Sequence, residues 1–158
     1  MYYRASNPPC SHSQSPFVRA DELKTIVKHV SPNILAVNEL GSTPTNGDNI
    51  LNTVLNTDGV TKYTQANYSN NNFSSIVNML FFDSTQVGLH SQDKVDKDLS
   101  NQDIVRVIDI YRLYYKDPKF HLGADTVFFN VVVAHLKASN GVANRTQRDK
   151  AAQALMAY

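Results

Sequence analysis

The sequence lacks the patterns that mark several common chemical classes. Its single cysteine, Cys10, permits no disulfide bond within the chain. It contains no Gly-rich phosphate-binding loop, no paired-cysteine zinc pattern and no Gly-x-Ser-x-Gly elbow. These absences give no sign of a nucleotide-binding loop, a cysteine-bound zinc site or a serine-elbow hydrolase.

Strong net charge and long hydrophobic runs are also missing. The formal net charge is +1, so no field of the whole protein attracts nucleic acid or an acidic membrane, and a polyanionic ligand needs a local basic patch. No run approaches the roughly 20 apolar residues of a membrane helix, and no charged and then apolar leader follows Met1. We expect no membrane span, and either a cytoplasmic protein or one from which a leader has been removed.

What is present indicates one soluble α/β domain. The chain has 158 residues, and its 42% apolar and 18% charged residues are ordinary for a globular protein. We expect loops at residues 1–16 and 63–72, and a hairpin that pairs residues 75–82 with residues 86–89. Apolar runs and helical spacing predict strands at residues 34–37, 75–82, 104–115 and 127–134, and helices at residues 20–30, 48–55 and 146–158. This order predicts a mixed, mostly antiparallel sheet with helices on at least one face.

Two predicted strands deliver polar residues at their carboxyl ends, where α/β sheets place chemistry. Residues 127–134 are almost entirely apolar, which predicts a strand buried on both faces, and His135 follows directly. Residues 34–37 lead in the same way into Asn38 and Glu39. We therefore expect Glu39 and His135 to face one shared cleft.

Three segments resemble, in the right order, motifs of the endonuclease/exonuclease/phosphatase superfamily, whose fold is the DNase I-like α/β sandwich. They are Pro-Asn-Ile-Leu-Ala-Val-Asn-Glu-Leu at residues 32–40, Asn-Met-Leu-Phe-Phe-Asp-Ser at residues 78–84, and Val-Val-Val-Ala-His-Leu-Lys-Ala at residues 131–138. The closest likeness is to bacterial secreted members, so removal of a leader would imply a secreted or periplasmic protein.

The resemblance covers only the front half of the family's domain. The family's opening strand carries an Asn just before the position of Tyr2, and no such residue is present. Its Gly-Asp-x-Asn motif and closing Asp-His pair lie beyond the helix at residues 146–158. We therefore expect residues 1–158 to form a single incomplete domain, a truncated chain or gene fragment whose C-terminal half is absent.

The resemblance implies hydrolysis of a phosphodiester or phosphomonoester with Mg²⁺ or Mn²⁺, with nucleic acid among the candidate substrates. It implies that Glu39 is the metal ligand, since carboxylate oxygen suits Mg²⁺, and that His135 donates a proton to the phosphate. Arg106, Lys137 and Asn38 are the candidates for contact with the substrate phosphate, and Asn38 suits a hydrogen-bonding neighbour better than a metal ligand.

Each candidate also has a simpler interpretation. Glu39 could be a solvated strand-end carboxylate, His135 could pack under the following helix, and Lys137 could be a solvated loop charge. Arg112 competes with Arg106 by position, and either could be solvated or ion-paired. Because the chain carries one candidate metal carboxylate, we expect it to bind Mg²⁺ weakly and to be inactive alone. The alternative is a non-catalytic remnant or a protein-binding module of the same fold.

Overall fold

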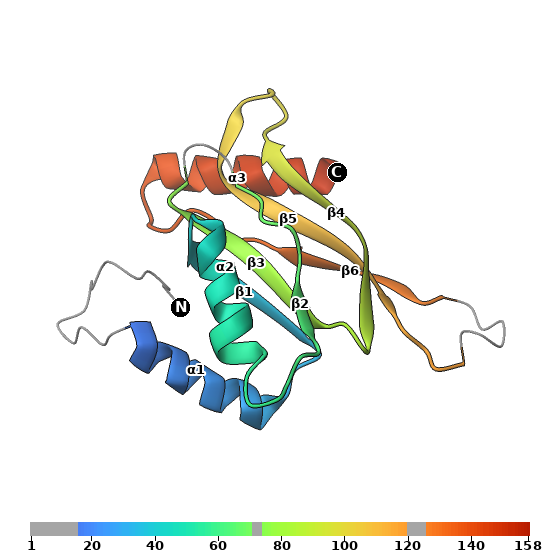
Figure 1. Ribbon diagram of the computed structural model, residues 1–158. Helices are drawn as coiled ribbons and strands as arrows, with labels where there is room; N and C mark the ends of the chain where they lie inside the picture. Colours follow the sequence, from blue (N-terminus) through green and yellow to red (C-terminus); the bar gives the residue numbers. More distant parts are fainter. Residues whose placement is uncertain (1–15, 71–73, 120–125) are drawn as a thin grey trace.

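A computed structural model describes residues 16–70, 74–119 and 126–158 of the chain (Figure 1). The helices are α1 (Pro16–Val30), α2 (Pro44–Ile50), which continues into the π-helical η1 (Leu51–Leu55), and α3 (Val142–Ala157). The strands are β1 (Ile34–Gly41), β2 (Tyr63–Gln65), β3 (Ile76–Asp83), β4 (Val87–Lys97), β5 (Asp103–Tyr115) and β6 (Phe128–Val133). The predicted α/β fold class is confirmed.

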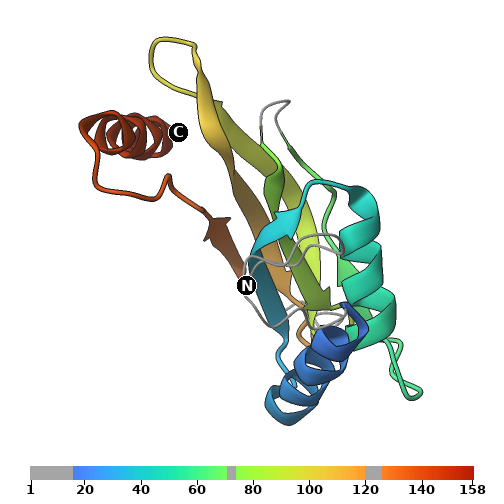
Figure 2. The same cartoon turned by 90° about the vertical axis from the view of Figure 1, so that its left-hand side faces the viewer.

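The strands form two antiparallel sheets rather than one, in the orders β1-β3-β2 and β4-β5-β6. The sheets face one another, with β3 against β5. Figure 2 shows α1 and α2 on one side of the strands and α3 on the other. Helices thus cover the outer face of each sheet, and the layers run helix, sheet, sheet, helix.

Strand β3 is the centre of the core, and all of its residues are buried. Successive side chains of a strand point to opposite faces. Met79 and Phe81 therefore pack under the helices, whereas Leu80 packs against Tyr111 and Leu113 of β5. An apolar run on both faces is what a strand between a helical layer and a second sheet requires.

The predicted hairpin between residues 75–82 and 86–89 is wrong, because β3 and β4 belong to different sheets. The chain crosses between the sheets through a turn in which Gln86 N–H donates to the carbonyl of Asp83. β4 pairs with β5 instead and extends to Lys97. Exposed polar and charged side chains along β4 conceal this strand in the sequence.

Strand β6 is present as predicted, but the prediction that both of its faces are buried is wrong. Its exposure alternates: Phe128 is 41% and Val132 is 46% exposed, whereas Val133 is buried. Within the described residues, β6 pairs only with β5 and lies at a sheet edge. An apolar composition therefore identifies a strand here but does not reveal its neighbours.

All of the predicted helices are confirmed, and each begins earlier than predicted. α1 and α2 begin at Pro16 and Pro44, where the missing N–H of proline removes no intrahelical bond. The predicted N-terminal loop lies outside the described residues apart from Pro16, and the predicted loop at residues 63–72 contains β2. Among the described helices, none is long and apolar enough to cross a membrane.

Candidate functional site

A β-bulge places the predicted metal ligand, Glu39. The pairing of β1 with β3 shifts register between Val37 and Leu40, so that Asn38 and Glu39 together oppose the single residue Asn78. Glu39 has a φ of 62°, in the left-handed region that non-glycine residues rarely adopt. Bulges re-aim side chains, and strained backbone of this kind clusters at functional sites.

His135 approaches Glu39 from the other sheet. It lies just beyond β6, and its Nε2 is 3.4 Å from Oε1 of Glu39. The two side chains are 22% and 35% exposed, so both remain accessible from solvent. The structure thus brings Glu39 and His135 together, although their strands are edge strands of stacked sheets rather than neighbours in one sheet.

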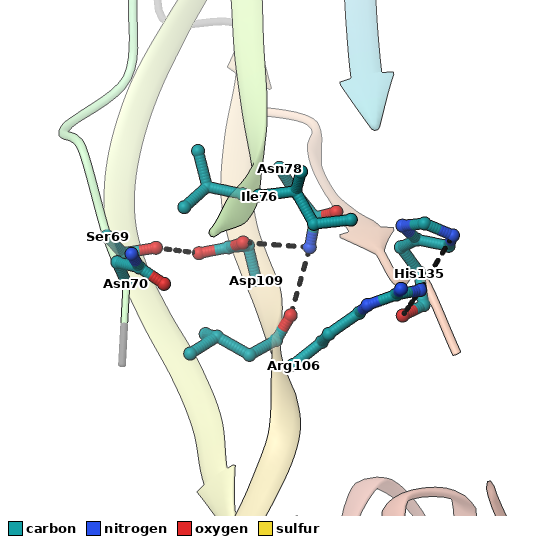
Figure 3. Close-up of a pocket in the computed structure, with 9 residues that line it drawn as sticks. Ser69, Asn70, Ile76, Asn78, Arg106, Asp109 and His135 are labelled. Carbon is teal, nitrogen blue, oxygen red and sulfur yellow. Dashed lines mark hydrogen bonds between the residues drawn. The ribbon is translucent and has the colours of Figure 1, made fainter. Parts of the chain in front are cut away.

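Arg106 of β5 joins this pair. Its Nη1 lies 2.8 Å from Nε2 of His135 (Figure 3). The same Nη1 donates to the carbonyl oxygen of Leu136 at 3.1 Å. A guanidinium only donates hydrogen bonds, so Nε2 of His135 accepts and the ring proton is assigned to Nδ1. That Nδ1 is buried and has no hydrogen-bond partner in the described part of the chain.

The surroundings of His135 favour its neutral form. Burial and then the Arg106 guanidinium lower the pKa of His135, and Glu39 only partly opposes them. The contact between His135 and Glu39 is therefore not an ion pair at neutral pH, despite its short distance. An anion beside the ring would reverse this preference, because an opposite charge favours the imidazolium.

The remaining predicted residues lie outside this cluster. Asn38 is exposed on β1, and Lys137 is half-buried in the loop after β6. Within the described residues, neither side chain forms a hydrogen bond or ion pair with Glu39, His135 or Arg106. Arg112, the competitor of Arg106, stacks on the Phe128 ring, with its Cζ 4.8 Å from the ring centroid.

Helix α3 anchors the loop that carries His135. Nη1 of Arg148 donates to the carbonyl oxygens of Lys137 and Ser139, at 2.8 Å each. Nε of Arg145 donates to the carbonyl oxygen of Asn140 at 3.0 Å. These bonds restrain the backbone that follows the histidine.

A small cavity of about 10 Å³ adjoins the site, and the sequence did not predict the buried polar groups in its wall. Asn78 is 4% and Asp109 is 1% exposed. Burial raises the pKa of Asp109, against hydrogen bonds from Ser69 and Asn78 that lower it. Polar residues inside apolar strand runs were the available signal. The lining residues are Ser69, Asn70, Ile76, Val77, Asn78, Arg106, Val107, Asp109 and His135.

Among Glu39, His135 and Arg106, the side-chain oxygen that could contact a divalent cation comes from Glu39. Across residues 16–70, 74–119 and 126–158, no three His, Cys, Asp or Glu side chains are grouped so that they could hold a metal ion. Mg²⁺ is commonly bound through one or two carboxylates, with water and substrate phosphate completing its coordination. Glu39, half-buried and open to solvent, fits such a ligand.

The amino-acid sequence matches no protein-family model and no curated protein. Any functional assignment therefore depends on the sequence motifs and on the geometry of Glu39, His135 and Arg106.

Proposed function

We propose that this chain carries part of the active site of a metal-dependent phosphoesterase with a DNase I-like fold. The observation that supports this most is the convergence of Glu39 from β1, Arg106 from β5 and His135 from the loop after β6. A carboxylate suits a hard cation, an imidazole suits proton transfer, and a guanidinium suits a phosphate. The three motifs that resemble the endonuclease/exonuclease/phosphatase superfamily point to the same chemistry.

In this proposal Arg106 receives the substrate phosphate. Its planar fork of N–H groups matches phosphate oxygens. A phosphate bound there draws the guanidinium away from Nε2 of His135 and places negative charge beside the ring. Both changes raise the pKa of His135, so that the imidazolium donates a proton to a phosphoryl oxygen as charge develops. A Mg²⁺ or Mn²⁺ ion on Glu39 would supply positive charge to the phosphoryl oxygens.

The base that activates the attacking water, and further metal ligands, would come from a C-terminal half of the domain. A second candidate is a non-catalytic remnant or protein-binding module of the same fold. Among the residues that the structure describes, Glu39 is the one carboxylate in contact with His135, and this favours the second candidate. The reading frame downstream of residue 158 distinguishes the two: a Gly-Asp-x-Asn motif and a terminal Asp-His pair support the enzyme.

The test measures hydrolysis of bis(p-nitrophenyl) phosphate and of DNA, with Mg²⁺ or Mn²⁺, by this chain and by a complete domain, if its reading frame encodes one. In the complete domain, His135→Ala lowers turnover by roughly 10²–10⁴-fold, and Glu39→Ala weakens metal dependence so that added Mg²⁺ recovers part of the rate. The 158-residue chain alone shows little or no turnover.

The matched control for the substrate-phosphate role is a pair of arginine variants on β5. Arg106→Ala raises KM, whereas Arg112→Ala, which loses only its contact with Phe128, leaves KM unchanged. The proposal fails if His135→Ala unfolds the protein and Mg²⁺ gives no rescue of Glu39→Ala, because both residues would then be structural.

A further inference from the structure

Asn78 is a polar residue in the middle of the most buried strand of the molecule. It is 4% exposed, and its neighbours along β3 are apolar. Burial of an amide is unfavourable unless its hydrogen-bonding groups find partners. The partners of Asn78 therefore explain its position.

The side-chain nitrogen of Asn78 bridges both neighbouring strands of the second sheet. It donates to the carbonyl oxygen of Val107 at 2.9 Å and to Oδ2 of Asp109 at 3.1 Å (Figure 3). It also donates to the carbonyl oxygen of Val133 at 3.0 Å. Val107 directly follows Arg106 on β5. Val133 ends β6, two residues before His135. Each carbonyl thus belongs to the backbone that carries a site residue.

Asn78 also faces the backbone position from which the Glu39 side chain extends. It is the single β3 residue that the bulge residues Asn38 and Glu39 oppose across the β1–β3 ladder. Glu39 therefore lies opposite Asn78, Arg106 precedes a residue that Asn78 contacts, and His135 lies two residues after another such residue. The three site residues nevertheless come from β1, from β5 and from the segment after β6.

Asp109 fixes the orientation of this amide. Its Oδ2 accepts from Asn78, and its Oδ1 accepts a close hydrogen bond from the Ser69 hydroxyl. An asparagine amide has two hydrogens, and here they are shared among three acceptors. A flipped amide would place its oxygen against three oxygens, so only one orientation is compatible with these neighbours.

We propose that Asn78, oriented by Asp109, is a positioning residue that sets the relative placement of Glu39, Arg106 and His135. It acts by joining β3 to β5 and β6 across the two sheets. A role of Asn78 in catalysis rests on the proposed phosphoesterase function, but the relative placement of the three site side chains is measurable without substrate or metal. Asp83 provides the comparison, because it is equally buried on β3 and distant from the site.

The readout is the tautomer of the His135 ring, from the imidazole ¹⁵N shifts at about pH 8, above the ordinary pKa of histidine. The wild-type chain has its proton on Nδ1, because Arg106 donates to Nε2. Asn78→Leu keeps a branched side chain with the same number of non-hydrogen atoms but has no donor, so β3 loses its side-chain hydrogen bonds to β5 and β6. The ring then populates both tautomers, and the backbone amide of Leu136 shifts.

Asp83→Asn is the matched control. It perturbs an equally buried polar group on the same strand, whose partners are Lys62 and Thr85. It lowers the melting temperature and leaves the His135 tautomer unchanged. If Asn78→Leu also lowers the melting temperature without moving the tautomer or the Leu136 amide, Asn78 is only structural and the inference is overturned.

A second variant keeps the inference testable if Asn78→Leu does not fold. Asn78→Ser replaces two amide donors with one hydroxyl donor, and a tautomer shift of smaller size is expected. An unchanged wild-type tautomer in a folded Asn78→Ser chain contradicts the inference. Absence of phosphoesterase activity in the complete wild-type domain would refute the proposed function and leave this result standing.

Discussion

Asn78 and Asp83 are both buried polar residues of β3, five positions apart, and they are held in different ways. Asp83 accepts from the backbone and hydroxyl of Thr85, two residues away, and pairs with Lys62 at 2.7 Å. Asn78 donates to residues that lie 29 to 55 positions further along the chain. The Asp83 side chain is thus held by one residue of its own turn and by one lysine, whereas Asn78 lies at a junction of four strands.

The difference shows where the candidate site obtains its geometry. At the turn end, Leu80 and Phe82 pack against Tyr111 and Leu113, so apolar contacts join the sheets. At the junction end, polar contacts through Asn78 and a small cavity replace them. Glu39, Arg106 and His135 therefore lie where directional hydrogen bonds join the two sheets. Such bonds restrict the relative positions of the joined groups more than apolar packing does.

The largest expected effect is a difference in unfolding free energy between a variant at Asn78 and a variant at Asp83. Asn78→Leu leaves two buried carbonyl oxygens and a buried carboxylate without their donor, and should lower the free energy of unfolding by about 3 kcal/mol. Asp83→Asn should lower it by about 1 kcal/mol, because Lys62 and Thr85 can turn to solvent. Urea unfolding at unchanged m-value measures both. A larger loss for Asp83→Asn would invert the comparison.

Replacing Glu39 with glycine should relieve the backbone strain of the β-bulge that faces Asn78. Glu39 has a φ of 62°, which an L-residue adopts at a cost and glycine adopts freely. We expect Glu39→Gly to be more stable than Glu39→Ala by about 1 kcal/mol. Thermal unfolding of the two variants measures the difference, and both lack the carboxylate. Equal stability would mean that the backbone at Glu39 is not strained.

The two ends should also differ in the pH dependence of stability. Burial raises the pKa of Asp109 above 3.8, so the folded chain binds the extra proton and this stabilisation is lost as pH rises through the folded pKa. Although burial raises it, hydrogen bonds from Lys62 and Thr85 bring the pKa of Asp83 below 3.8. The stabilisation from Asp83 is present above 3.8 and is lost as pH falls through the folded pKa.

Asn variants of the two aspartates measure these opposite slopes. The unfolding free energy of Asp109→Asn, relative to wild type, should rise as the pH increases above 3.8. That of Asp83→Asn should fall as the pH increases toward 3.8. Urea unfolding across an acid-to-neutral pH series gives both, and slopes of the same sign would show that Asp109 is not penalised by burial.

The sequence predicts those features that depend on local pattern. Apolar runs reveal β3, β5 and β6, and the motifs around Glu39 and His135 indicate residues that the structure brings within 3.4 Å. It does not reveal that β6 is an edge strand, because composition does not specify neighbours. It names Arg106 as the candidate, with Arg112 as a competitor by position, and in the structure Arg106 contacts His135 whereas Arg112 contacts Phe128.

The sequence does not predict the contacts of Asn78 and Asp109, for a related reason. Asn78 and Asp109 interrupt apolar runs, which marks them as unusual, but their partners come from distant strands. The part of β4 beyond Leu89 escapes prediction because its solvent-facing side is charged. Long-range contacts that form only when two sheets close on each other leave little trace in a single sequence.

The most direct test of the central claim is paramagnetic broadening by Mn²⁺ in the amide NMR spectrum of the chain. If Glu39, His135 and Arg106 form a metal-assisted phosphate site, substoichiometric Mn²⁺ broadens the signals of Glu39 and His135 first, and Glu39→Gln abolishes this. Inorganic phosphate then shifts the Arg106 side-chain signal. Broadening that centres on another part of the chain, or that persists in Glu39→Gln, would contradict the account.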